Sequence, residues 1–453
     1  MSDEGLQLAE AKMRAAGVAP AAIEVFGHNY RLAETGASGL IREDTIEALV
    51  DPPQFADIRV TDEAAREAIA RTVMIKLNGG LGTSMGLDQA KTLLEVRDGR
   101  NFLDLIVHQV EAARLAYDAP LPLLFMNSFR TREDTLEHLR RYPDLRVGDL
   151  PLDFLQNAEP KITVDGLLPV EWPADPSLEW CPPGHGDLYT ALLGSGILER
   201  LVAAGFRYAS VANGDNLGAA PDASLAAWFA ATGAPYAAEI CPRTINDRKG
   251  GHLAIRRSDG QLILRDTAQT APEEMDFFTD EHRHPYFHCN NLWIDLERLL
   301  ETLRSRGAVL GLPLIRNEKT VDPADGRSPK VIQLETAMGA AIEVFEGATC
   351  IAVPRDRFLP VKTTNELLLL RSDIFELRAD GRLVQAVPVV PRVDLDPRFY
   401  KLVDDFEARV PVPPSLRDAT ALVVQGDWTF AGPVRVEGEL ILPDRGGSAV
   451  IGA

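Results

Sequence analysis

Residues 73–96 constrain the fold of this chain more than any other stretch. They begin with a short apolar run, residues 73–75, which is typical of a buried strand. A glycine-rich loop follows from Asn78, and Lys91 stands at its far end. Because glycine has no Cβ, the backbone of such a loop approaches a ligand closely, and its successive N–H groups form a concavity that suits anions. The stretch therefore predicts a strand, a loop and a lysine that together cradle a phosphate.

Two common phosphate-binding loops do not match this sequence. A P-loop places a glycine directly before its lysine, but Ala90 precedes Lys91. The dinucleotide-binding fingerprint has the spacing G-x-G-x-x-G, and the run from Gly80 to Gly86 is one residue too long for it. On the loop alone, a glycine-rich surface turn with a solvated lysine remains an alternative interpretation.

The overall charge limits the partners that we expect. The 453 residues include 47 Lys and Arg and 67 Asp and Glu, which gives a net charge of −20. Such a charge disfavours a nucleic-acid or anionic-membrane partner, although a local lysine cluster still suits a small anionic substrate. The sequence has no apolar span of about 20 residues and no signal-sequence pattern at its start, so we expect a cytoplasmic protein. Four widely separated cysteines indicate reduced, interior thiols, namely Cys181, Cys241, Cys289 and Cys350.

The sequence pattern predicts three regions. Residues 1–70 are rich in Ala, Glu and Leu, and they predict helices at 6–17, 21–35 and 42–50. Residues 71–375 alternate between apolar runs and helical stripes, which predicts an α/β domain whose sheet is covered by helices. Residues 376–453 combine alternating apolar residues with recurring turn glycines, which predicts short strands. The edges of such strands offer a surface for self-association.

Ligands of an open α/β sheet bind beyond the carboxyl ends of its strands. Asn78, Asn127 and Asn213 each follow an apolar run that predicts a strand. We therefore expect their loops to gather at one mouth of the sheet. Asp215 follows the third of these strands, and its carboxylate is a ligand of the kind that Mg²⁺ prefers. An Asx turn explains the same aspartate equally well.

Further polar groups stand at predicted turns. Residues 181–187, CPPGHGD, place His185 between two glycines on a loop that prolines stiffen. Gln156 carries an amide with both a donor and an acceptor, as recognition of a nucleobase requires. Lys362 lies shortly before a predicted helix. Residues 282–289 contain three histidines and a cysteine, but no second ligand pair lies at zinc-finger spacing, so we reject a zinc site.

Taken in chain order, these motifs are similar to those of one family. The string LNGGLGTSMG at residues 77–86, with Lys91 after it, resembles the nucleotide-binding loop of the UTP–glucose-1-phosphate uridylyltransferases, or UDP-glucose pyrophosphorylases. Ser84 and Met85 favour this branch over the related UDP-N-acetylhexosamine pyrophosphorylases, which carry Arg and Leu there. The motifs MNSFRTREDT, CPPGHGD, NGDNLG and NNLW follow in family order, so the resemblance covers roughly residues 70–440.

Two places depart from the family pattern. Gln89-Ala90 stands where the family usually has Gly-Pro, just before Lys91. His288-Cys289 stands where the family has Asn-Thr, in a stretch whose asparagines contact the sugar. The second departure leaves the identity of the hexose open.

The resemblance implies a Rossmann-like mixed sheet of the glycosyltransferase-A-like nucleotidyltransferase type, with a helical N-terminal segment and a C-terminal β-helix. It implies a nucleotide site that contains Leu77, Asn78, Gly79, Gly80, Lys91, Gln156, Gly184 and Lys362. It also implies a sugar-phosphate site that contains His185, Asn213, Gly214, Asp215, Gly251, Asn290 and Asn291, with Lys249 and Gln269 near the sugar. In this scheme Asp215 holds Mg²⁺, and Lys91 and Lys362 are the catalytic residues.

The implied reaction joins UTP and glucose 1-phosphate to give UDP-glucose and pyrophosphate, by in-line attack on the α-phosphorus. Two alternatives stay open. One is the same chemistry on galactose or N-acetylglucosamine 1-phosphate, and the other is a non-catalytic regulator that binds a nucleotide sugar. The presence of Lys91, Lys362 and Asp215 favours the enzyme, since binding alone does not require the metal ligand.

Overall fold

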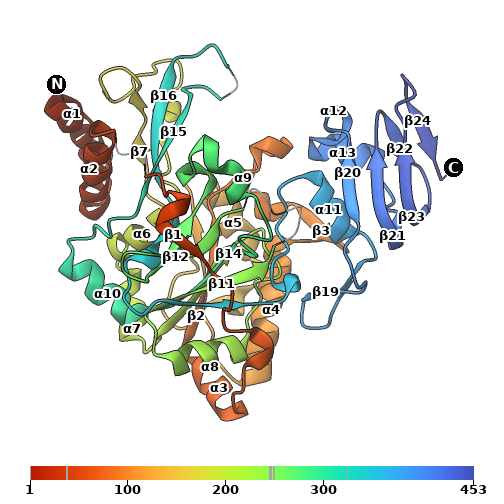
Figure 1. Ribbon diagram of the computed structural model, residues 1–453, viewed down its shortest axis with the longest axis horizontal. Coiled ribbons are helices and arrows are strands. Elements are labelled where there is room, and N and C mark those ends of the chain that lie inside the picture. The colour runs from red at the N-terminus through yellow and green to blue at the C-terminus, as the bar shows by residue number, and fades with distance from the viewer. Residues whose placement is uncertain (1, 37–38, 244–246, 248–249, 324, 453) are drawn as a thin grey trace.

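The computed structural model describes residues 2–36, 39–243, 247, 250–323 and 325–452. Its centre is a mixed sheet of seven strands in the order β17–β11–β14–β10–β2–β5–β6 (Figure 1). Their bounds are β2 Thr72–Asn78, β5 Leu123–Asn127, β6 Asp153–Leu155, β10 Tyr208–Asn213, β11 Tyr236–Pro242, β14 Tyr286–Asp295 and β17 Thr349–Ala352. Strands β10, β2, β5 and β6 run parallel, and β14 is antiparallel to both of its neighbours. The predicted α/β class with a mixed sheet is confirmed, and the sheet is rich in parallel pairs.

Helices cover both faces of this sheet because both faces of its strands are apolar. In β2, Met74 faces one core, while Val73 and Ile75 face the other. The first core includes α3 Asp62–Ala70, α4 Phe102–Tyr117 and α8 Ala223–Thr232. The second includes α6 Leu188–Gly194, α7 Ile197–Ala203 and α10 Leu296–Ser305. Burial on two sides explains why the strand sequence is continuously apolar rather than alternating.

The carboxyl ends of the parallel strands meet at one edge, as predicted. Asn78 and Asn127 pair in register, and the amide of Asn78 donates to Asn127 Oδ1 at 2.8 Å. Asn213 pairs with Leu77. The three predicted loops therefore gather at a single mouth of the sheet.

Smaller elements surround the central sheet. The hairpin β12 His252–Arg256 and β13 Leu262–Arg265 pairs with β1 Ile46–Ala48, and β15 Leu314–Thr320 and β16 Lys330–Thr336 pair with β8 Ile162–Thr163. Two-stranded pairs join β3 Glu95–Arg97 to β4 Arg100–Asn101 and β7 Glu159–Pro160 to β9 Trp180–Cys181. Short helices are α5 Arg132–Leu139, α9 Met275–Phe278 and α11 Thr364–Arg371. The four cysteines are free and buried. No helix within the described parts of the chain is long and apolar enough to cross a membrane.

The N-terminal region contains two of the predicted helices but not the third. α1 Ser2–Ala15 and α2 Pro20–Glu34 pack together through an apolar cluster. The helix predicted at 42–50 was wrong, because these residues form a 3₁₀ turn followed by β1. Ile46 of β1 packs on Ala254 and Ile263, and Glu43 accepts a hydrogen bond from buried Arg265. These tertiary contacts override the local preference for a helix.

The C-terminal region is built from short strands at the opposite end of the molecule from α1 and α2 (Figure 1). β20 Arg392–Leu395, β21 Ser415–Val424 and β23 Arg435–Leu442 run parallel, as do β22 Trp428–Phe430 and β24 Ala449–Ile451. The hairpin β18 Phe375–Leu377 and β19 Leu383–Gln385 and the helices α12 Pro397–Tyr400 and α13 Val403–Arg409 complete the region. The strands predicted for these residues are present.

A buried ion pair joins the central sheet to the segment that leads toward the C-terminal region. Arg357 donates to both oxygens of Glu239 on β11 at 2.8 Å, and Trp293 Nε1 donates to the same carboxylate at 3.0 Å. Burial alone would raise the pKa of Glu239, but the charge and hydrogen bonds of Arg357 lower it below its ordinary value. The carboxylate is therefore ionised and fully satisfied inside the protein.

A buried lysine lies close to this pair. The Lys76 ammonium on β2 is 1% exposed and donates to the carbonyl of Ala219 at 2.7 Å. Burial and, to a smaller extent, the charge of Arg357 lower the pKa of Lys76 to about 7, against the opposing effect of Glu239 and Asp215. Lys76 therefore titrates near neutrality.

The Arg357→Met substitution should reduce the free energy of unfolding by ~3–5 kcal/mol, because it leaves the Glu239 carboxylate buried without its cation. Urea denaturation measures this change. The matched control is Arg435→Met, which removes an exposed arginine paired with Asp418 and should have only a slight effect. A loss no larger than that of the control would contradict the importance of the buried pair.

The Lys76→Met substitution should change the pH dependence of stability. The unfolded chain holds the Lys76 proton up to about pH 10, whereas the folded chain releases it near pH 7, so stability contributed by this group rises with pH between these values. At about 1.36 kcal/mol per pKa unit, the free energy of unfolding of the wild type should rise by up to ~4 kcal/mol relative to that of the variant between pH 7 and pH 10. Denaturant titrations across this range measure the difference. Exposed Lys330, changed to Met, should show no such trend.

Candidate active site

The glycine loop after β2 is held from below by the side chain of Asn78. This amide donates to Asn127 Oδ1 and Thr135 Oγ1, both at 2.8 Å, and accepts from Thr92 Oγ1 at 2.6 Å. Leu77 lies at the end of β2, and its carbonyl accepts from the backbone N–H of Gly214 at 2.8 Å. The loop of Asn78 is thus tied both to the loop after β5 and to the loop after β10.

Glycine is required where three loops approach one another. A Cβ at Gly79 would lie 2.7 Å from Gln156 Oε1. Gly184 has a φ of +78°, and a Cβ there would lie 2.7 Å from the carbonyl oxygen of Thr336. Gln156 Nε2 donates to the carbonyl of Gly184 at 2.9 Å. The structure therefore brings Gly79, Gln156 and Gly184 together, while Gly80 faces open space.

The predicted lysine and the predicted metal ligand form an ion pair. Lys91 Nζ lies 2.6 Å from Asp215 Oδ2, and the two side chains are 17% and 19% exposed. The same ammonium donates to the carbonyl of Val361. Lys362 follows Val361 on the exposed surface, and Thr363 then caps the first turn of α11, the helix predicted there. Lys91 therefore contacts both Asp215 and the backbone of the residue that precedes Lys362.

Three of the predicted sugar-phosphate residues, His185, Gly251 and Asn290, lie around His288, whereas Asn213, Gly214 and Asp215 lie at the end of β10 and in the loop after it. His185 Nδ1 accepts from the backbone N–H of Met338 at 3.0 Å, and burial lowers the pKa of His185 although Asp266 and Glu335 oppose this. The carbonyl of Gly251 accepts from the N–H of His288 at 2.8 Å. Burial, with the charge of His185, lowers the pKa of His288 to about 4. His288 is therefore neutral at physiological pH.

Asn290 belongs to this group, whereas Asn291 does not. Asn290 has a φ of +56°, and its backbone N–H donates to His288 Nδ1 at 3.2 Å. Asn291 instead lies in the buried network, where its amide donates to Glu239 Oε2 at 3.0 Å and accepts from Asn216 at 3.0 Å. Asn291 thus supports the back of the site through other side chains.

The loop after β10 is supported by a residue that the sequence did not single out. Asn216 Oδ1 accepts from the N–H of Gly218 at 3.1 Å and from the N–H of Leu359 at 2.8 Å. The carbonyl of Asn213 accepts from the N–H of Asn216 at 3.1 Å, and a Cβ at Gly214 would lie 2.9 Å from the Leu77 carbonyl. Asn216 thereby connects the Asp215 loop to the segment before Lys362. Asn216 directly follows Asp215 in the chain, and a single asparagine in a turn gives no sequence signal for such a connection.

Asp215 is a suitable ligand for a magnesium ion shared with phosphates. Mg²⁺ in nucleotide sites is commonly held by one or two carboxylates together with substrate oxygens rather than by a full protein cage. The ion pair with Lys91 uses Oδ2, and a carboxylate has a second oxygen. Among the residues that the structure describes, no group of three or more His, Cys, Asp or Glu side chains forms a metal site. As a single carboxylate, Asp215 therefore fits a metal whose other ligands come from outside the protein.

Two further predicted positions have different outcomes. Lys249 lies outside the described residues. Gln269 is buried, and its side chain accepts from the N–H of Asp266 at 2.9 Å in a capping box. It therefore shapes the turn that carries Asp266.

Comparison with known proteins agrees with the geometry. The family model for UTP–glucose-1-phosphate uridylyltransferase matches residues 25–437. The enzyme of that name from Saccharomyces cerevisiae is 40% identical over 377 residues, which cover 83% of this chain and 74% of the relative. The one from Solanum tuberosum is 36% identical over 412 residues, which cover 90% and 84%.

Solved structures show the same fold. The UDP-glucose pyrophosphorylase of Leishmania major, described in open and closed structures, is 42% identical, has a TM-score of 0.92 and covers 99% of this chain and 97% of its own. A variant of that protein in complex with UDP-glucose has a TM-score of 0.92, with 42% identity and coverage of 99% and 96%. The chain belongs to the UTP–glucose-1-phosphate uridylyltransferase family.

Proposed function

We propose that this protein makes UDP-glucose and pyrophosphate from UTP and glucose 1-phosphate. The observation that carries the proposal is the Lys91–Asp215 pair beside the glycine loop, at the carboxyl edge of the parallel strands, in a chain of this family. An oxygen of the sugar phosphate forms a new bond to the α-phosphorus of UTP. The bond from that phosphorus to the pyrophosphate oxygen breaks in line with it.

Such a reaction requires alignment of two anions and neutralisation of the charge that develops between them. Leu77, Asn78, Gly79 and Gly80 hold the nucleotide through their backbone, and Gln156 and Gly184 hold its base. Lys91 and Lys362 neutralise the phosphates, with Lys91 exchanging part of its contact with Asp215 for them. These lysines approach from two different segments, which suits an extended triphosphate.

The sugar phosphate binds next to the base, since His185 directly follows Gly184 in the chain. We assign its contacts to His185, Asn213, Gly214, Gly251 and Asn290. Asn291 acts through the buried network. Asp215 would hold Mg²⁺, which supplies further positive charge at the phosphates when it is bound. Neutral His185 and His288 offer hydrogen bonds to hydroxyl groups rather than a charge.

We also infer three functional regions, residues 1–70, 71–375 and 376–453. The middle region is the catalytic domain, with the glycosyltransferase-A-like arrangement of nucleotidyltransferases. The parallel pairs among β20–β24 support a small β-helix in the last region, whose strand edges are available for self-association. The acidic charge supports a cytoplasmic enzyme that acts on small anions and has no nucleic-acid or membrane partner.

Pyrophosphate release with UTP and Mg²⁺ tests the function directly. We expect turnover with glucose 1-phosphate that is much faster than with galactose or N-acetylglucosamine 1-phosphate. Faster turnover with another sugar would keep the mechanism and assign the changed specificity to His288-Cys289. Binding of UTP without pyrophosphate release from any of the three would contradict the enzymatic proposal and favour a regulator.

Alanine substitution of either catalytic lysine should reduce kcat by ~10²–10³-fold, because each removes a positioned charge from the transition state. Steady-state kinetics of Lys91→Ala and Lys362→Ala measure this, with circular dichroism to establish that each variant is folded. Lys330→Ala, which removes an exposed lysine of β16, is the matched control and should leave kcat unchanged. Near-normal turnover in a folded variant would remove that lysine from the mechanism.

A further inference from the structure

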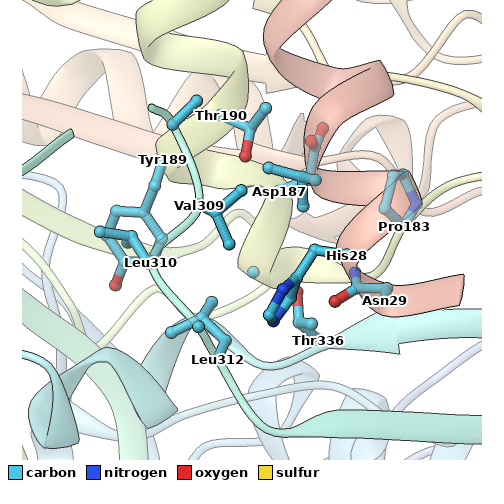
Figure 2. A pocket seen from close by; sticks show the side chains of 14 residues that line it. His28, Asn29, Pro183, Asp187, Tyr189, Thr190, Val309, Leu310, Leu312 and Thr336 are labelled. Atoms are coloured by element: carbon cyan, nitrogen blue, oxygen red, sulfur yellow. The ribbon is translucent and has the colours of Figure 1, made fainter. Parts of the chain in front are cut away.

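Asp187 is a buried carboxylate that the proposed reaction does not use. It ends the CPPGHGD motif, is 4% exposed, and lies directly before α6. Figure 2 shows it on the wall of a small cavity of about 20 Å³ that also carries His28 and Asn29 of α2. Burying a carboxylate is unfavourable unless its oxygens find hydrogen-bond donors. The groups that donate hydrogen bonds to Asp187 therefore indicate the role of this residue.

Both oxygens of Asp187 are engaged by one residue. The backbone N–H of Asn157 donates to Oδ2 at 2.6 Å, and the side-chain amide of Asn157 donates to Oδ1 at 2.8 Å. A two-point contact of this kind fixes both the position and the orientation of the Asn157 peptide. We call this contact the Asp187–Asn157 clamp.

The clamp acts on the neighbour of Asn157. Gln156 precedes Asn157, and its own N–H donates to the carbonyl of Asn127 at 2.7 Å. Its side chain spans from Gly79 to the Gly184 carbonyl. The N–H of Asp187 in turn donates to that same Gly184 carbonyl at 3.3 Å. One aspartate therefore fixes both the chain that carries Gln156 and the loop that Gln156 contacts.

We propose that Asp187 is a positioning residue that sets the Gln156 amide for the base of the nucleotide. The inference rests on the proposed nucleotide site. It goes beyond that site because Asp187 is not one of the residues that we assign to the nucleotide. It predicts that loss of the clamp weakens binding of UTP and leaves the sugar phosphate and the chemical step largely unaffected.

The charges around Asp187 are consistent with this role. Burial raises the pKa of Asp187 to about 7, and the two hydrogen bonds from Asn157 oppose that rise. Buried Glu159 on β7 is the neighbouring acid, and its pKa is raised by burial and by the charge of Asp187. His28 faces the same cavity from α2. Burial thus favours the protonated acid, and the two N–H donors of the clamp favour the ionised carboxylate that they bind.

The test begins with Asp187→Ala, which removes both acceptors of the clamp. Asp187→Asn alone would not serve, because the Asn157 amide could turn over and restore both hydrogen bonds. We expect the KM and Kd for UTP to rise ~10-fold, as loss of a hydrogen bond to a charged group predicts, with kcat and the KM for glucose 1-phosphate changed less than threefold. The exchange variant, Asn157→Asp with Asp187→Asn, restores two donors facing two acceptors and should return the Kd for UTP to within threefold of wild type. Asp165→Ala, which alters an exposed carboxylate, is the matched control.

A double-mutant cycle separates positioning from general support. If Asp187 acts through Gln156, then Asp187→Ala should cause no further loss of UTP affinity in a Gln156→Ala background. Wild-type affinity in folded Asp187→Ala, additive losses in the cycle, or a folded exchange variant that stays weak would each overturn the proposal. If the single variant fails to fold, calorimetric titration of the exchange variant with UTP decides the test by itself. An exchange variant that does not fold would also overturn the proposal. Failure of the wild type to bind UTP would instead contradict the proposed function.

Discussion

The ion pair between Glu239 and Arg357 is the interaction on which the site most depends. A carboxylate and a guanidinium that are this deeply buried are tolerated because they form two hydrogen bonds with each other and both groups make further hydrogen bonds. Trp293 and Asn291 complete the bonding of Glu239. The carbonyl of Arg357 accepts from both Asn216 and Asn291 at 3.2 Å. The pair therefore anchors two backbone segments to the middle of the sheet.

Through these segments the pair reaches the residues that we assign to the phosphates. Asn216 is next to Asp215 and also accepts from the N–H of Leu359, so the Asp215 loop and the segment before Lys362 are held by one amide. Lys91 joins the two, since it pairs with Asp215 and donates to Val361. In the proposed reaction, a triphosphate would therefore meet a lysine whose position these contacts already fix.

The sequence predicted what is local and missed what is long-range. A strand, a glycine loop and a lysine follow one another in the chain, so the mouth of the sheet and the gathering of Asn78, Asn127 and Asn213 could be foreseen from strand ends alone. Glu239 and Arg357 are 118 positions apart, and neither has a local pattern that indicates burial. Residues 42–50 have helical composition, yet pairing of β1 with β12 decides their structure. The burial of Asn291 was missed for the same reason. It depends on the left-handed backbone of Asn290 and on a register shift in the pairing of β14 with β11, and neither has a local sequence pattern.

The two halves of the proposed site are held by different means. Lys91 and Asp215 are held by charge, through their ion pair. Gln156 and Gly184, which we assign to the base, are held by a neutral hydrogen bond, by close packing and by the Asp187–Asn157 clamp. Gly184 and Gly186 allow no Cβ because Thr336 lies against both. Because a neutral hydrogen bond contributes little net free energy, the precision of the proposed base site depends on how firmly Gln156 and Gly184 are fixed.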